Sequence, residues 1–285
     1  MVSNLPQREE YFKRKRRKRL IRIGLVILSV IFVVGITSYI SHRSKIRISK
    51  VELAGGVLVT KAEVESESLK YMNGSYFWLF PKNNALWYPN KNLQNYLRET
   101  FKRIDTINIS RKDFKTITIE ITERKPIATW CDPLPNSTTT PLMEDGSNLE
   151  NCYFLDQNGT IFAPAPYFSG DAYFKYYGLV VTDRPIGMQY IASTTEFSEI
   201  IDFIEAIKKL GIKPKYLIAK GNNEFSLATG GSGQIYFDTK IPLSRVAENL
   251  AALLRTPELS TTSSQDLPVE YIDMRFGNKL FYKLK

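Results

Sequence analysis

The chain of 285 residues carries 39 Lys and Arg against 29 Asp and Glu, a formal net charge of +10. The first 22 residues hold nine basic and two acidic side chains, so they carry +7 and the remainder of the chain only +3. Basic residues gathered directly before an apolar segment are typical of contact with anionic lipid. This distribution favours membrane lipid and argues against nucleic acid as a partner.

A candidate transmembrane helix follows the basic tail of residues 1–19. Residues 20–40 are apolar apart from Arg22 and a few small polar residues, and about 20 helical residues are needed to cross a bilayer core. The competing interpretation is a cleaved secretory signal, whose apolar region runs to about 15 residues and ends in small residues. This segment is longer, and Tyr39, Ile40 and the basic residues beyond them make a poor cleavage site. We therefore favour an uncleaved anchor.

The charge distribution also predicts the orientation of this anchor. The N-terminal flank is more densely basic than the C-terminal one, and basic flanks stay in the cytoplasm. The sequence therefore predicts a single-pass protein of the plasma (inner) membrane, with a cytoplasmic N-terminus and residues 43–285 outside the cytoplasm.

Residues 46–123 are predicted to form a domain in the order strand, helix, helix, strand, strand. The first strand is expected at 46–53. A capping box, in which Thr60 is followed three residues later by Glu63, begins a helix that extends to about residue 71. Apolar residues at helical spacing mark a second helix after Pro89: Leu93, Tyr96, Leu97 and Phe101. Isoleucines at alternate positions predict a closing hairpin: Ile107, Ile109, Ile117, Ile119 and Ile121.

The two cysteines, Cys131 and Cys152, fall in the extracytoplasmic part. Each is expected at the end of a short strand, with a Pro-, Ser- and Thr-rich loop at 132–151 between them. An even number of cysteines in an oxidising compartment predicts a disulfide, which would contribute roughly 3 kcal/mol by closing this loop. Two free thiols are the alternative. A zinc site is not supported, because the spacing is wrong and the sequence has a single histidine.

Residues 124–285 are predicted to form a second, β-rich domain, a mixed sheet with helices packed on it, which makes the whole chain α+β. Hairpins are expected at 153–162, around an Asn-Gly turn, at 224–238 and at 269–284. Ser193 and Glu196 form a second capping box. The helix that follows has an apolar face made of Phe197, Ile200, Ile201, Ile204, Ile207 and Leu210. Another helix is expected after Pro242.

The sequence carries no recognisable catalytic motif, and we expect neither an enzyme nor a metal or cofactor site. The lone histidine, His42, lies at the membrane exit, away from any partner. The glycines at 230–233 lie between two strands and so predict a hairpin turn instead of a phosphate-binding loop. Asp156, Asp238 and Asp273 fall at strand ends or in hairpins, where turn-forming or solvated roles are usual.

The last predicted strand, 279–284, is expected at the margin of its sheet. Lysines discourage self-pairing of such an edge, whereas exposed apolar side chains suit a specific partner. Two interpretations stay open from the residues alone: an edge that is merely protected by charge, and an edge that binds a partner. The residues concerned are Phe276, Lys279, Leu280, Phe281, Tyr282 and Lys283.

Four short motifs in this order resemble the FtsQ/DivIB family of bacterial cell-division proteins. They are ISKVELAG at 48–55, ERKPIA at 123–128, YFLDQNGTIF at 153–162 and YIDMRF at 271–276. The resemblance extends over the whole chain, from the basic tail and single span to a small first domain and a larger β-rich one. It implies that residues 46–123 form a POTRA-like domain and residues 124–285 an FtsQ/DivIB-type domain.

The resemblance also implies a function. Such proteins are non-enzymatic components of the divisome, located at the septum, where they link division proteins and help control septal peptidoglycan synthesis. The implied main partner is FtsB, paired with FtsL, which adds a strand along the last strand of the chain. Other divisome proteins are expected to bind the POTRA-like domain. The alternatives are a membrane-anchored envelope enzyme or a sensor with an extracytoplasmic domain.

Overall fold

The chain divides into two compact units, Met1–Glu123 and Arg124–Lys285. Both combine helices and sheets, which confirms the expected α+β class. A computed structural model describes residues 5–132, 151–168, 172–180, 182–260, 267–277 and 279–285.

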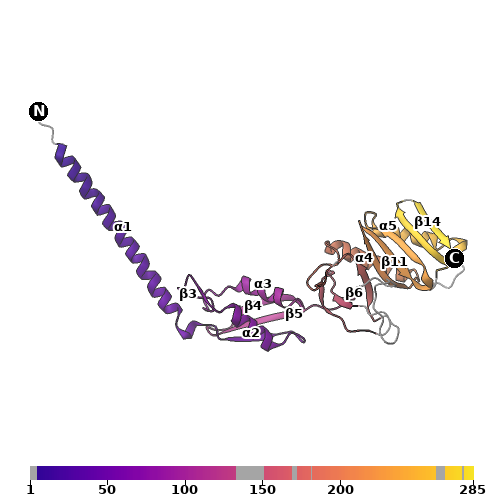
Figure 1. Ribbon diagram of the computed structural model, residues 1–285, viewed down its shortest axis with the longest axis horizontal. Coiled ribbons are helices and arrows are strands. Elements are labelled where there is room, and N and C mark those ends of the chain that lie inside the picture. Colours follow the sequence, from indigo (N-terminus) through magenta and orange to yellow (C-terminus); the bar gives the residue numbers. More distant parts are fainter. Residues whose placement is uncertain (1–4, 133–150, 169–171, 181, 261–266, 278) are drawn as a thin grey trace. The chain divides into compact units, whose positions relative to one another are not determined.

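The first unit begins with α1 (Leu5–Ser41), a continuous helix of 37 residues (Figure 1). The part Tyr11–Ser41 is long and apolar enough to cross a membrane, which confirms the single apolar N-terminal helix. Large apolar side chains point outward all round it; Val26 is 63% and Phe32 67% exposed, as suits a helix surrounded by lipid. The helix starts well before the apolar segment, so the basic cluster at 13–19 is helical.

A three-stranded sheet with two helices forms the folded part of this unit. Strand β5 lies in the centre, parallel to β1 and antiparallel to β4. Alternate isoleucines of β4 and β5 are buried together with Val64, Leu93 and Leu97 of the helices, so period-two strands and helical stripes meet in one core. The elements are β1 (Lys50–Ala54), α2 (Lys61–Tyr71), α3 (Asn90–Thr100), β4 (Ile104–Arg111) and β5 (Thr116–Glu123).

Two features of the first unit differ from the prediction. The first strand begins at Lys50 and not at residue 46, because Ser44–Ile46 forms a 3₁₀ turn and the next residues bond to another segment. The N–H of Ile48 donates to the carbonyl of Asn83 at 2.7 Å. A short hairpin, β2 (Ser75–Tyr76) and β3 (Phe80–Pro81), was not predicted, since two-residue strands carry no alternating pattern.

The second unit is built on a nine-stranded mixed sheet in the order β14-β13-β12-β11-β10-β9-β6-β7-β8. The three predicted hairpins are present as β7–β8, β11–β12 and β13–β14, and the sheet is mixed as expected, because β6–β9, β9–β10 and β12–β13 are parallel. Helices α4 and α5 lie in the connections to β10 and β13. The elements are β6 (Ala128–Asp132), β7 (Asn151–Leu155), β8 (Ile161–Pro164), β9 (Phe174–Gly178), α4 (Thr194–Lys209), β10 (Pro214–Gly221), β11 (Glu224–Thr229), β12 (Gln234–Asp238), α5 (Leu243–Leu253), α6 (Pro257–Ser260), β13 (Val269–Phe276) and β14 (Lys279–Leu284).

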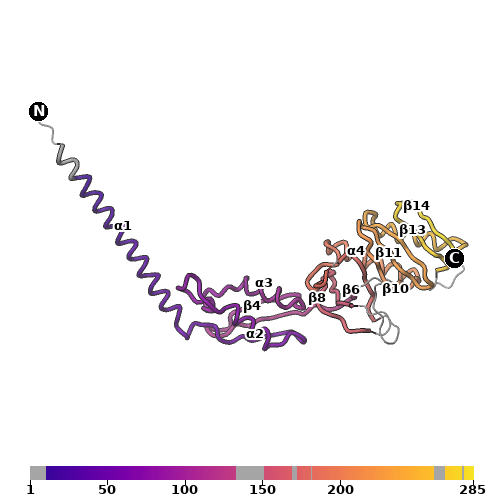
Figure 2. Tube along the Cα trace, in the orientation of Figure 1, coloured from indigo at the N-terminus to yellow at the C-terminus, as the bar shows by residue number. Residues whose placement is uncertain are grey.

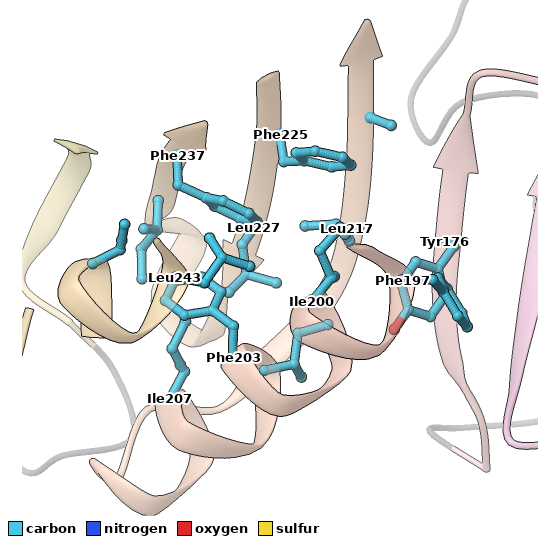
Figure 3. Packing of buried hydrophobic residues seen from close by; sticks show 14 of the residues in the cluster. Tyr176, Phe197, Ile200, Phe203, Ile207, Leu217, Phe225, Leu227, Phe237 and Leu243 are labelled. Carbon is cyan, nitrogen blue, oxygen red and sulfur yellow. The ribbon is translucent and has the colours of Figure 1, made fainter. Parts of the chain in front are cut away.

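Helices α4 and α5 cover one face of this sheet, and the hydrophobic core lies between the helices and the sheet (Figure 3). The buried residues of α4 include four of the six predicted ones, with Ile201 and Leu210 partly buried. Phe203, which the prediction omitted, is also buried; its ring lies 4.7 Å from that of Phe237. Fully burying such aromatic side chains is worth roughly 1.5–3 kcal/mol each.

Cys131 and Cys152 form a disulfide, as predicted. They face each other in the antiparallel ladder of β6 and β7, with Cα atoms 4.1 Å apart. Each lies inside its strand and not at its end, because the ladder extends to Asp132 opposite Asn151. The rest of the predicted loop, residues 133–150, lies outside the described residues.

Asp156 is a buried turn-forming residue, which is one of the two roles predicted for it. Its side chain is only 4% exposed and pairs with Arg124 at the start of the second unit. It also accepts the N–H groups of Asn158 and Thr160 at 2.9 Å, which closes the β7–β8 turn. The turn-forming role was therefore predicted correctly, while the ion pair that accompanies burial was not.

Candidate functional site

Strand β14 lies at one margin of the nine-stranded sheet and pairs only with β13 among the strands of the described residues. Figure 2 traces this hairpin at the C-terminal end of the chain. Its position agrees with the expectation for 279–284. A marginal strand presents one row of backbone N–H and C=O groups that no strand of its own sheet uses.

The opposite margin of the sheet, β8, differs from β14 because its start is paired with another segment of the chain. A segment near residue 188 runs along it: the N–H of Ile161 donates to the carbonyl of Met188 at 2.9 Å, and the N–H of Gly187 donates to the carbonyl of Ile161 at 2.6 Å. Thr160 and Gln189 form an additional isolated bridge. The start of this edge is therefore covered by the protein's own chain, which is a common protection against unwanted pairing.

The direction of each backbone group of β14 follows from one hydrogen bond at its end. The N–H of Lys285 donates to the carbonyl of Pro268 at 3.1 Å and so points toward β13. Successive N–H groups of a strand point to opposite sides, and the register irregularities of this ladder insert residues in β13 and not in β14. The N–H groups of Phe281 and Lys283 therefore point inward. Those of Leu280, Tyr282 and Leu284 point to the free edge.

The structure gathers the predicted site residues on this hairpin, on both of its faces. Phe276 and Phe281 are 56% and 51% exposed, and their rings meet edge to face with centroids 5.4 Å apart. Tyr282 lies opposite Ile272 on the core side and keeps 39% of its surface exposed. Leu280 is half-buried and packs against the core.

The two lysines of the predicted site differ in their surroundings. Lys279 is exposed at the turn, opposite Phe276. Lys283 makes an ion pair of 2.5 Å with Glu270, and this bond raises the pKa of the Lys283 ammonium group. Both partners are more than half exposed, so the pair adds little to stability. It fixes part of the positive charge along the edge.

A polar and aromatic row continues from the edge across the face that α4 and α5 leave open. Tyr236, Asp273 and Phe281 lie in register on β12, β13 and β14, with their side chains on one face. Arg275 donates to both oxygens of Asp273, at 2.9 and 2.6 Å, and to Glu224 at 2.6 Å. The hydrogen bond from Arg275 lowers the pKa of the Asp273 carboxyl, so this buried aspartate is paired and not solvated, contrary to the prediction.

Sequence reasoning missed this row. The guanidinium carbon of Arg275 lies 5.4 Å from the ring centroid of Tyr236, and the ammonium of Lys220 lies 4.6 Å from it, so two cations flank one ring. The alternating pattern of residues 234–238 was the one local signal for this row, because it places Tyr236 on the face of the sheet away from the core-facing Ile235. The parallel pairing of β12 with β13, which brings Tyr236 next to Asp273, has no local signal.

The arrangement is suited to binding an extended segment. Within the described ranges, no cluster of three His, Cys, Asp or Glu side chains could hold a metal ion. A strand added at β14 would use the outward N–H groups of Leu280, Tyr282 and Leu284, while its side chains would meet Phe281 on one face and Tyr282 on the other.

No protein-family model matches this chain, and no curated protein matches it either.

Proposed function

We propose that this chain is a bitopic, non-enzymatic component of the bacterial divisome, of the FtsQ/DivIB type. It links division proteins at the septum and helps control septal peptidoglycan synthesis through contacts outside the cytoplasm. The N-terminal tail is cytoplasmic, α1 spans the inner membrane, and both folded units lie beyond it. The partner at β14 is a strand of an FtsB-type protein, itself paired with an FtsL-type protein.

One observation carries this proposal: β14 is an open sheet edge that bears exposed aromatic side chains, while the other edge of the same sheet is covered at its start by the protein's own chain. A chain that protects one edge and leaves the second one free is suited to strand addition at the second. Main-chain hydrogen bonds supply affinity in such complexes, and the side chains of Phe276, Phe281 and Tyr282 supply selection.

The first unit supports the same assignment. Apart from the short hairpin β2–β3 between the two helices, its order of strand, helix, helix, strand, strand, with β5 between β1 and β4, resembles a POTRA module. We propose that residues 46–123 are such a module and that it binds further divisome proteins. The motif resemblance in both units adds to this support, because the motifs follow one another in the order of the family.

Localisation tests the division role most directly. A fluorescent fusion at the N-terminus should gather at midcell in dividing cells, and depletion of the protein should produce filaments that wild-type protein rescues. A uniform envelope signal together with normal division of depleted cells would contradict the proposal and favour an anchored enzyme or sensor.

Binding variants test the β14 edge. Phe281→Ala should weaken binding of an FtsB-type extracytoplasmic segment by about 1–2 kcal/mol, roughly 5- to 30-fold, because it removes an exposed aromatic contact. Tyr167→Ala is the matched control, since Tyr167 is 72% exposed in the same unit but away from β14, and it should bind normally. Equal affinities for both variants, or full affinity after truncation behind Gly277, would move the site elsewhere.

The predicted orientation has its own test. A reporter that is active only in the cytoplasm, fused after Lys285, should remain silent, because the basic cluster retains the N-terminus inside. A reporter that is active only outside should give a signal at the same position. The reverse pattern would overturn the orientation and, with it, the extracytoplasmic partner.

A further inference from the structure

The short hairpin β2–β3 of the first unit exposes two neighbouring aromatic side chains. Phe77 is 88% and Trp78 is 93% exposed at its tip, between the paired residues Tyr76 and Phe80. The N–H of Leu79 donates to the carbonyl of Tyr76 at 3.0 Å and closes the turn. Two large adjacent side chains presented outward on a tight turn mark a surface that contacts something apolar.

The backbone of this turn makes the choice of residues more unusual. Phe77 has φ of 48° and Trp78 has φ of 62°, both in the left-handed region. Hairpin turns of this geometry favour Asn-Gly, because bulky side chains are strained there. Strain of this kind persists where the side chains serve a function that a relaxed turn would not provide.

Hydrogen bonds tie the hairpin to the end of α1. The hydroxyl of Ser38 donates to the carbonyl of Leu79 at 2.7 Å. Close by, the amide of Asn84 donates to the hydroxyl of Ser41 at 2.8 Å, and both of these residues are buried. The tip is therefore held beside the last turn of the candidate transmembrane helix, where the apolar segment ends.

The surroundings of the tip have the composition of a membrane–water interface. Trp87 is 47% exposed in the same region. The ammonium of Lys82 lies 5.9 Å from the ring centroid of Tyr76, and the guanidinium of Arg43 donates to the hydroxyl of Tyr39 at 2.7 Å. Tryptophan and tyrosine with lysine and arginine beside them are the residues that gather at this level of a bilayer.

We propose that the turn Phe77-Trp78 inserts into the membrane–water interface on the side where α1 leaves the bilayer. The lipid surface is the occupant, because the Ser38 bond places the turn next to the helix that enters it. The first unit is then held by α1 and by the turn, and this second attachment restricts its rotation about the helix. The inference rests on α1 crossing a bilayer and is independent of the division role.

Quenching of tryptophan fluorescence by brominated lipids tests the insertion. The full-length chain is placed in nanodiscs of phosphatidylcholine and phosphatidylglycerol, and emission is compared between wild type and Trp78→Phe, so that the difference reports Trp78. We expect lipids brominated near the headgroup to quench this difference several-fold more than lipids brominated at the chain terminus. Trp130, 2% exposed in the core of the second unit, is the reference; its emission is measured in a variant that carries both Trp78→Phe and Trp87→Phe, and it should not respond.

A second variant separates lipid contact from folding. Phe77→Asn with Trp78→Gly supplies the residues that the turn geometry prefers, so the protein in micelles should unfold at the same temperature as wild type or higher. In nanodiscs, the amides of the β1–β5–β4 sheet should keep their exchange protection, while limited proteolysis within residues 75–81 should become faster because the turn no longer enters lipid.

Two results would overturn the inference. One is a Trp78 emission that bromolipids leave unchanged while an aqueous quencher reduces it, since the turn would then face water or a protein partner. The other is a clear loss of thermal stability in the Asn-Gly variant in micelles, since the two aromatic side chains would then be part of the fold.

Discussion

The side chain of Glu123 connects the end of β5 to the loop before α2, and its removal gives a sharp local prediction. One carboxylate oxygen accepts the backbone N–H groups of Val57, Leu58 and Val59, each at 2.8 Å. Burial raises the pKa of the Glu123 carboxyl, but these three N–H groups outweigh it, and the pKa is lower than the ordinary value of about 4.5. The loop is therefore held by a charged acceptor.

The magnitude follows from the exposure of the three donors. Val59 is 7% exposed, so water cannot easily reach its N–H when the Glu123 carboxylate is removed. A hydrogen bond to a charged group is worth about 1.5–3 kcal/mol, and we expect most of the loss to come from this bond. Val57 and Leu58 are 90% and 62% exposed, and water can replace their bonds at little cost. We expect Glu123→Ala to destabilise the first unit by about 2 kcal/mol and Glu123→Gln by about 1 kcal/mol.

The assay combines thermal unfolding in micelles with hydrogen exchange of a peptide covering 57–59. Glu123→Ala should lower the melting temperature of the first unit by roughly 10 °C and speed this exchange, while the exposed Glu120→Gln on the same strand should change neither. The pKa of the Glu123 carboxyl is lower in the folded state than in the unfolded state. The stabilisation is therefore present at any pH above the unfolded-state pKa, and it disappears as the pH falls through the folded-state pKa. Unchanged exchange at 57–59 in Glu123→Ala would refute this reasoning.

Three further predictions concern the second unit. Alkylation of the unreduced protein should modify neither Cys131 nor Cys152, and two reactive thiols would contradict the bridge. Replacing both cysteines by Ser should lower the free energy of unfolding, measured by chemical denaturation, by at most about 3 kcal/mol. Asp156→Ala should lower the free energy of unfolding by about 1.5–3 kcal/mol, because it removes the charged acceptor of the Arg124 guanidinium and of two turn N–H groups; a loss below about 1 kcal/mol would show that these bonds are unimportant. Tyr282→Pro should abolish partner binding but not folding, because the N–H that it removes points to the free edge. Phe281→Pro removes an N–H that points to β13, so it should also lower stability by about 1–3 kcal/mol. Equal melting temperatures of the two variants would contradict the assigned N–H directions.

Local sequence patterns predicted where helices begin but not what every side chain contacts. In the first capping box, Thr60 and Glu63 bond to each other as the spacing implies. In the second, Ser193 accepts the N–H of Glu196, but the carboxylate of Glu196 accepts the hydroxyl of Thr239 at 2.6 Å instead. The helix starts as predicted in both cases. The competing partner comes from 43 residues further along the chain, outside any local pattern.

Non-local pairing accounts for most of the remaining differences. The pairing of β14 with β13 could be predicted, because a Gly-Asn pair between two alternating runs in the sequence indicates a hairpin. The row of Tyr236, Asp273 and Phe281 could not, since β12 and β13 are parallel and are brought together across α5. The ion pair of Arg124 with Asp156 is likewise a long-range contact that burial makes necessary.

Hydrogen exchange at the free edge of β14 tests strand addition most directly. Amide exchange is followed by NMR with and without a saturating FtsB-type segment, and the amides of Phe281 and Lys283, which point to β13, serve as the internal reference. On binding, the outward amides of Leu280, Tyr282 and Leu284 should become strongly protected while the reference amides change little. Binding that leaves these three outward amides as exchangeable as before would contradict strand addition at this edge.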